Sequence, residues 1–126
     1  MDSLTIEETN YTPKVDFNLD SHEFEIAGNS FPENSKKFYE PVIDWLQQYV
    51  EEPSSNTRVT FRLEYISSSS LKNVLNMLKI LKKIHGKGLG LEINWFYDED
   101  DDDILDAGVK LSNITDLEFK LEAFSE

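Results

Sequence analysis

Hydrophobic and polar residues alternate in five short stretches of the chain, a pattern that is typical of half-buried β-strands. The five stretches are residues 15–19, 24–26, 57–66, 91–97 and 117–121. Asp20-Ser21-His22 separates the first two stretches, and its composition favours a turn. The first two stretches therefore predict a β-hairpin.

Three further stretches repeat their hydrophobic residues at the period of an α-helix. The first begins at Asn34 or Ser35, and Pro41 inside it predicts a bend, because proline lacks the N–H that a helix interior uses. The second runs from about Ser69 to Ile84 and is followed by a glycine-rich segment that favours a helix end. The third and shortest runs from Ile104 to Leu111.

The predicted elements follow the order β-β-α-β-α-β-α-β, which indicates an α/β fold. Strands joined through helices favour a parallel arrangement, so we expect a mixed, mostly parallel sheet with the opening hairpin as its antiparallel edge. Residues 1–14 show no periodicity and are expected to form a loose N-terminal arm. Residues 15–126 are expected to form a single small domain, in line with a chain of 126 residues.

Composition narrows the classes of function. The chain has no cysteine, which excludes disulfides, thiolate nucleophiles and cysteine-based zinc sites. No apolar run reaches the length of a membrane span, and the acidic N-terminus lacks a signal-peptide pattern, so we expect a cytoplasmic protein. The net charge of -13 disfavours nucleic acids and anionic membranes as partners, because their phosphates are negative too.

One segment departs from the acidic character of the rest. Between Glu64 and Glu92 the chain carries no Asp or Glu but several lysines. Helical spacing places four polar residues on the side of the second predicted helix that lies opposite its leucines. We expect this polar face to bind a partner protein; it consists of Lys72, Asn76, Lys79 and Lys83.

Candidate catalytic and metal sites are weakly supported. Ser69-Ser70-Leu71-Lys72 matches a Ser-x-x-Lys pattern, but the companion motifs of the acyl-transferring enzymes are absent. His22 and His85 stand alone and form no triad or metal motif. The acidic run at residues 98–103 lacks the glycine and the spaced glutamate of a calcium loop, so a solvated surface or a docking surface for a basic partner is favoured over a metal site. No cofactor and no metal ligand is predicted.

Four consecutive serines, at residues 67–70, stand where the third strand becomes the second helix. A single hydroxyl suffices to cap a helix, and either Ser67 or Ser68 can do so. Good caps usually bring an acid into the first turn, but here Leu71 and Lys72 occupy it. The positive end of the helix dipole is thus without a negative partner, and a phosphate on Ser68 would supply one.

Several segments together resemble the SiaC-like regulatory phosphoproteins of bacteria. The matching segments are Thr-Pro-Lys-Val-Asp-Phe at residues 12–17, Gly-Asn-Ser-Phe-Pro-Glu-Asn at 28–34, Phe-Tyr-Glu-Pro-Val-Ile-Asp-Trp-Leu at 38–46, Tyr-Ile-Ser-Ser-Ser-Ser-Leu-Lys at 65–72, and Trp-Phe-Tyr at 95–97 with the following acidic run. The resemblance implies a hydroxyl residue at the strand–helix joint that a kinase phosphorylates and a phosphatase clears. That acceptor falls on Ser68, with Ser67 and Ser69 as alternatives because the family usually has threonine there.

The resemblance also implies that the unmodified form binds and activates a diguanylate cyclase, which produces cyclic-di-GMP, a signal in biofilm formation. The predicted element order additionally resembles the STAS-like architecture of anti-sigma-factor antagonists, which carry a phosphoserine at a similar joint. We therefore expect a non-enzymatic partner-switching protein with a serine/threonine kinase, a phosphatase and an effector as its partners. The alternatives are an anti-sigma-factor-antagonist-like regulator of a transcription or stress pathway, a small metal-dependent enzyme using the acidic run, and a passive oligomerisation module whose lysine face is buried between identical subunits.

Overall fold

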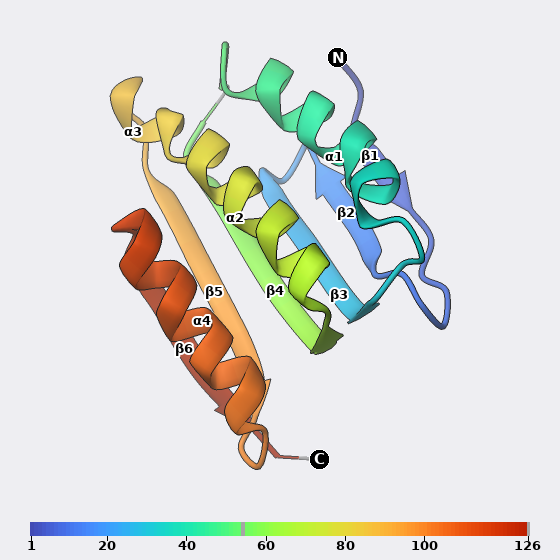
Figure 1. Ribbon diagram of the computed structural model, residues 1–126. Coiled ribbons are helices and arrows are strands. Elements are labelled where there is room, and N and C mark those ends of the chain that lie inside the picture. The colour runs from blue at the N-terminus through green and yellow to red at the C-terminus, as the bar shows by residue number, and fades with distance from the viewer. Residues whose placement is uncertain (54, 126) are drawn as a thin grey trace.

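A single six-stranded sheet forms the back of the molecule in the computed structural model, which describes residues 1–53 and 55–125 (Figure 1). The strands lie in the order in which they occur in the chain. Their bounds are β1 Leu4–Ile6, β2 Lys14–Asn18, β3 Glu23–Ser30, β4 Thr57–Ile66, β5 Leu91–Asp98 and β6 Phe119–Phe124. The pairings β1–β2 and β2–β3 are antiparallel, whereas β3–β4, β4–β5 and β5–β6 are parallel. The predicted α/β class with a mixed, mostly parallel sheet is confirmed.

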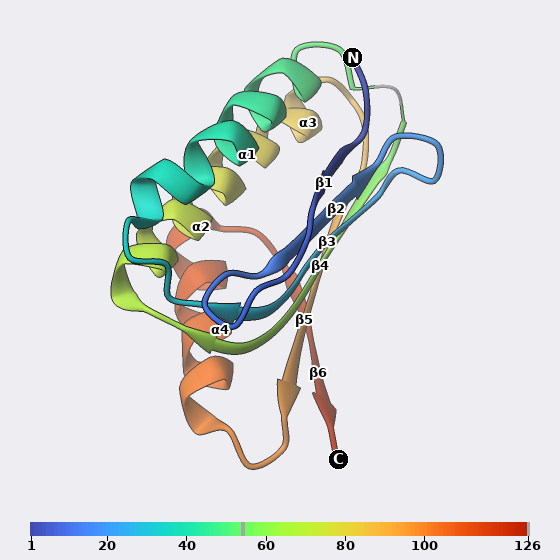
Figure 2. The same cartoon turned by 90° about the vertical axis from the view of Figure 1, so that its right-hand side faces the viewer.

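Every helix lies on the same face of this sheet (Figure 2). The helices are α1 Ser35–Tyr49, α2 Ser68–Leu81, the short α3 Lys83–Gly86 and α4 Asp102–Thr115. The one-sided arrangement follows from the strand order: each parallel crossover steps in the same direction, and crossovers share one handedness. The opposite face of the sheet is therefore left without a helix. None of the described helices is long and apolar enough to span a membrane.

The core lies between the sheet and the helix layer, where the apolar side of each strand meets the apolar stripe of each helix. Trp95 on β5 is fully buried at its centre and packs against the rings of Phe61 and Phe119. Its indole N–H donates to the carbonyl oxygen of Ile104 at 2.8 Å. Gly108 allows this close approach, since a Cβ there would lie 2.5 Å from the indole ring.

The expectation of a loose arm over residues 1–14 is wrong for its first part. Leu4 and Ile6 lie in β1 and pair with Phe17 and Val15 of β2. The indole N–H of Trp45 also donates to the carbonyl oxygen of Asp2 at 2.8 Å. A three-residue strand is too short for its alternation to stand out in the sequence, which explains why the pattern did not predict it.

Two of the three predicted helices differ in their bounds from the observed ones. The second predicted helix divides into α2 and α3, because the last turn tightens: the N–H of His85 bonds to the carbonyl of Lys82, three residues back. This tightening places Ile84 in the core. The helix predicted from Ile104 to Leu111 begins earlier, at Asp102, since its first turn is polar and gives no hydrophobic signal, and it ends later, at Thr115. Ser54, in the loop after α1, and Glu126 lie outside the described residues.

α1 begins at Ser35 with Asn34 as its N-cap, one of the two starts that the sequence left open. The side-chain oxygen of Asn34 accepts a hydrogen bond from the N–H of Lys37 at 3.1 Å. The helix runs unbroken through Pro41, which is exposed. Water can therefore bond the carbonyl that the missing N–H leaves without a partner.

Candidate phosphorylation site and docking face

The serine run occupies the joint at which β4 leads directly into α2. Ser67 is the N-cap, with an extended backbone (φ -74°, ψ 161°), and its hydroxyl accepts a hydrogen bond from the N–H of Ser70 at 3.2 Å. The N–H of Ser67 donates to the carbonyl of Ser30 on β3 at 2.8 Å, which fixes the joint to the neighbouring strand. The first turn of α2 contains no acidic residue.

Two of the four serines are committed to the structure of the joint. Ser70 is fully buried and accepts hydrogen bonds from the hydroxyls of Ser30 at 2.8 Å and Ser67 at 3.0 Å. Because Ser30 gives its only hydroxyl hydrogen to Ser70, the phenol of Tyr39, 2.6 Å away, donates to Ser30. Burial raises the pKa of Tyr39, although its hydrogen bonds with Ser30 and Ser70 oppose this. The chain of hydroxyls thus links α1, β3 and α2.

Ser68 and Ser69 remain exposed at the surface. Ser69 lies close to the cap, with its hydroxyl 3.3 Å from that of Ser67. Ser68 is the first residue of α2, and within the described part of the chain its hydroxyl makes no hydrogen bond. Of the three acceptors that the sequence left open, Ser68 is therefore exposed and has the least engaged hydroxyl.

Ser68 borders a pocket of about 390 Å³ between the serine joint and the start of α4. Ser67, Ser68 and Leu71 line it from the α2 side, and Asp103 and Lys110 belong to the α4 side. Further lining residues are Glu64, Tyr65, Ile66, Asp101, Ile104, Asp106 and Ala107. Carboxylates therefore predominate among the charged groups beside Ser68, and Lys72 is not part of the lining.

The serine run and the acidic run are far apart in the sequence, but in the structure they line the same pocket. β4 and β5 are parallel neighbours, so the segments that follow them both begin at the carboxyl ends of the strands. This adjacency follows from parallel pairing only when β4 and β5 are also neighbours in the sheet. What the sequence did not provide was the order of the strands in the sheet.

Two carboxylates of the acidic run, those of Asp98 and Asp101, accept hydrogen bonds from nearby backbone N–H groups. Asp101 is the N-cap of α4 and accepts a hydrogen bond from the N–H of Ile104 at 3.1 Å. Asp98 accepts one from the N–H of Asp100 at 2.9 Å. Over residues 1–53 and 55–125, no three His, Cys, Asp or Glu side chains gather in a way that would hold a metal ion. His22 lies in the β2–β3 turn and His85 in α3, and neither lines the serine pocket.

The predicted docking residues are all exposed. Lys72, Asn76 and Lys79 project from α2, whereas Lys83 begins the separate helix α3. α2 lies between α1 and α4 in the helix layer (Figure 1), so this polar face is framed by a helix on either side. Among the described residues, these three lysines take part in no ion pair, which leaves their charges available to a partner.

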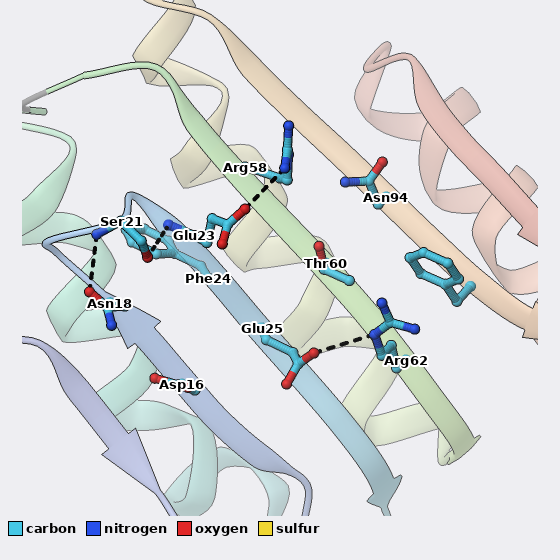
Figure 3. Close-up of a pocket in the computed structure, with 11 residues that line it drawn as sticks. Asp16, Asn18, Ser21, Glu23, Phe24, Glu25, Arg58, Thr60, Arg62 and Asn94 are labelled. Carbon is cyan, nitrogen blue, oxygen red and sulfur yellow. Dashed lines mark hydrogen bonds and ion pairs between the residues drawn. The ribbon is translucent and has the colours of Figure 1, made fainter.

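The bare face of the sheet has a different electrostatic character. A hollow of about 440 Å³ there is lined by β2 to β5 and the β2–β3 turn, with acidic residues on β2 and β3 and arginines on β4 (Figure 3). Arg58 pairs with Glu23 and Glu92, at 3.0 and 2.7 Å. The ammonium of Lys120, 2.9 Å away, lowers the pKa of Glu92 to about 2, with help from Asn94 and Arg58. Charges on this face thus largely neutralise one another and offer no open anion site.

The two-layer α/β fold and an exposed serine at a helix N-terminus are compatible with a small regulatory protein that phosphorylation switches. Comparison with known proteins gives the family. Residues 6–124 match the family model described as SiaC family regulatory phosphoprotein, and the chain belongs to this family. The resemblance stated from the sequence motifs is confirmed.

Individual relatives agree with this assignment. The chain is 25% identical to an uncharacterized protein of Pseudomonas aeruginosa strain UCBPP-PA14 over the full length of both. The crystal structure of apo-SiaC from Pseudomonas aeruginosa is similar with a TM-score of 0.88 and 25% identity, covering 98% of this chain and 100% of that one. A second similar structure shows the diguanylate cyclase SiaD in complex with its activator SiaC from the same species, again with a TM-score of 0.88 and 25% identity, covering 96% and 99% of the two chains.

Proposed function

We propose that this protein is a non-enzymatic, cytoplasmic partner switch whose state is set by phosphorylation of Ser68. A cognate serine/threonine kinase adds the phosphate and a phosphatase removes it. The unmodified form binds and activates a diguanylate cyclase, as the complex of the similar SiaC with SiaD supports. The observation that carries the proposal is the state of the four serines: Ser67 and Ser70 are held in hydrogen bonds at the joint, whereas Ser68 is exposed with its hydroxyl unengaged.

The electrostatics of the joint explain how a phosphate would act. A phosphoserine carries roughly -1.5 to -2 charges. On Ser68 it would meet free N–H groups and the positive end of the α2 dipole, but also the carboxylates of Asp101, Asp103 and Asp106 across the pocket. The added charge therefore makes the surface at the start of α2 more negative. A cyclase surface that docks on the lysines of α2 would then face a dianion at one end of its binding site.

Mapping of the phosphate tests the site. The protein is co-expressed with its kinase, and peptides are analysed by mass spectrometry for the wild type, Ser68→Ala and the matched control Ser69→Ala. We expect phosphate on Ser68 in the wild type and in Ser69→Ala, and its loss in Ser68→Ala. Phosphate that persists in Ser68→Ala on a residue outside 67–70 would refute the assignment.

Calorimetry with the cyclase tests the docking face. Lys72→Glu combined with Lys79→Glu reverses two charges on α2, and Lys36→Glu combined with Lys37→Glu makes the same change on the exposed side of α1. Each surface charge contributes a few tenths to about 1 kcal/mol, so we expect the α2 pair to weaken binding by about tenfold or more. The α1 pair is expected to bind like the wild type. Equal affinities for the two folded double variants would place the cyclase elsewhere on the molecule.

The absence of catalysis is also part of the proposal. It rests on the lack of a paired nucleophile and base at the serine joint, where the hydroxyls contact one another and the helix backbone. A screen of hydrolase and transferase substrates, with and without magnesium, is expected to show no turnover. Magnesium-dependent activity that disappears in Asp101→Asn would support the enzyme alternative instead.

A further inference from the structure

β6 is an edge strand whose outer side has no partner within the described chain. Figure 1 shows it at the end of the sheet with no element beyond it. Six residues long, it ends the parallel half of the sheet, whereas the strand at the other edge, β1, has three. A long edge strand presents a row of backbone N–H and C=O groups that can pair with another strand.

The backbone pairing with β5 shows which residues of β6 face outward. The carbonyl of Phe124 accepts a hydrogen bond from the N–H of Glu99, so Phe124 directs its backbone groups toward β5. In an extended strand these directions alternate from one residue to the next. Lys120 and Glu122 therefore also direct their backbone groups inward. The residues whose N–H and C=O point away from the sheet are Phe119, Leu121 and Ala123.

This alternation and the side-chain charges together select one way for two β6 strands to pair. In an antiparallel pair, outward-facing residues must lie opposite outward-facing residues, so the pairing can be centred on Leu121 or shifted by two residues in the partner strand. Centred on Leu121, Lys120 of each copy lies opposite Glu122 of the other. The shifted pairings instead place Lys120 opposite Lys120, or Glu122 opposite Glu122, and like charges directly opposite are unfavourable.

The helix above β6 provides an apolar contact at the same level. Lys110 of α4 lines the pocket toward α2 and Leu111 faces the core, so Leu105 and Val109 occupy the outer side of the helix. Val109 is 40% exposed, and Leu121 on β6 is 39% exposed. Leu121 lies about 13 Å along the chain from Leu117, which follows the end of α4. The same length of helix holds about nine residues. Counted back from the end of α4, this places Leu121 at a level between Leu105 and Val109.

We propose that two copies of this protein associate through antiparallel pairing of their β6 strands, centred on Leu121, to form one continuous sheet. Glu122 of each copy joins Lys120 of the other on the bare face of the sheet, where Lys120 already contacts Glu92 of its own chain at 2.9 Å. Leu105, Val109 and Leu121 of the two copies meet on the helix side. The surface lies on the outer edge of the sheet, away from Ser68, and the proposal is independent of the phosphorylation mechanism.

Sedimentation equilibrium over a range of concentrations at physiological ionic strength tests the association. We expect a monomer–dimer equilibrium for the wild type. Lys120→Glu or Glu122→Lys places like charges opposite one another twice in the symmetric pair and should weaken the dimer by about tenfold. The combined reversal, Lys120→Glu with Glu122→Lys, restores opposite charges and should bring the affinity back toward that of the wild type. Glu40→Lys, an exposed change on α1, is the matched control and should have no effect.

A second variant tests the backbone pairing without changing charge. Ala123→Pro removes an N–H that points outward, so the β5–β6 ladder keeps its hydrogen bonds while the edge is blocked. We expect a folded monomer, with the fold checked by circular dichroism. A wild type that stays monomeric at all concentrations overturns the proposal. A dimer that tolerates Glu122→Lys and Ala123→Pro, or one that is lost when Lys72 and Lys79 are changed to Glu, also overturns it.

Discussion

Two strand-to-helix joints lie next to each other at the carboxyl ends of β4 and β5, and they differ in the charge that surrounds the helix N-terminus. At the β5–α4 joint, Asp101 caps the helix, and Asp102 and Asp103 fill its first turn. At the β4–α2 joint, Ser67 caps the helix and the first turn has no acid. Negative charge near a helix N-terminus is stabilising, so the first joint already has what the second lacks.

This difference shows at which joint an added phosphate group would have the larger electrostatic effect. A phosphate at the α4 joint would add to three aspartates and gain little. A phosphate at the α2 joint meets an unsatisfied dipole on its own helix and the aspartates of the neighbouring joint across the pocket. The serine joint is therefore sensitive to phosphorylation for two reasons. Its helix has no acidic residue in the first turn, and carboxylates lie across the pocket beside it.

The largest effect is expected from breaking the buried half of the serine joint. Ser70→Val replaces a buried hydroxyl that accepts two hydrogen bonds, leaving the hydroxyls of Ser30 and Ser67 without that acceptor. We expect a loss of about 3 kcal/mol in the free energy of unfolding, because unsatisfied buried polar groups and an added methyl group both cost stability. Urea denaturation measures it, with the exposed Ser69→Ala as the control. A loss below about 0.5 kcal/mol would show that the hydroxyl chain is not a structural tie.

A somewhat smaller effect is expected in the middle of α4, the helix of the other joint, where Gly108 packs on Trp95. Gly108→Ala would place a Cβ 2.5 Å from the indole ring of a fully buried side chain. Overpacking of this kind typically costs 1–3 kcal/mol, against about 1 kcal/mol of helix propensity gained, so we expect a net loss of about 1–2 kcal/mol. Thermal unfolding followed by circular dichroism checks this. An unchanged or raised midpoint would mean that α4 can shift away from β5 at little cost.

Removing each cap compares the joints directly. Ser67→Ala and Asp101→Ala each delete the side chain that accepts the N–H of the residue three positions on. We expect about 1 kcal/mol from each, with Asp101→Ala the more costly at low salt because a charge is lost at the dipole as well. Urea denaturation at two salt concentrations separates the loss of the capping hydrogen bond from the loss of the charge near the helix dipole. If the salt dependence is the same for both variants, the charge on Asp101 does not distinguish the joints.

The smallest effect is expected from placing one carboxylate in the first turn of α2, which has no acidic residue. Ser68→Glu places an acid in the first turn of α2, which is worth about 0.3–1 kcal/mol in isolation. Asp103 and Asp106 across the pocket oppose it, so we expect a net change of a few tenths of a kcal/mol. In a background with Asp103→Asn and Asp106→Asn, the same substitution should become clearly stabilising in urea denaturation. Equal effects in the two backgrounds would show that the aspartates do not sense charge at residue 68.

The sequence predicted what depends on local periodicity and missed what depends on neighbours. The strands around Phe61 and Trp95 were predictable because alternation reports a half-buried surface directly. Which serine caps α2 was left open, since Ser67 and Ser68 have the same chemistry and differ only in backbone conformation at the joint. The pocket that Ser68 shares with the acidic segment depends on the order of the strands, which local patterns do not encode.

The sequential order of the strands has a consequence for how the chain acquires its structure. Each parallel strand pairs with the one made just before it, and a single helical crossover closes each unit. Each parallel pairing spans only one crossover, the shortest separation that parallel strands allow, although parallel pairing is still slow to form. As the chain leaves the ribosome, β4 can join β3 with α1 already in place, and β5 and β6 can follow in turn. We expect the sheet to grow from one side to the other during synthesis, so that β6 is the last strand to be added.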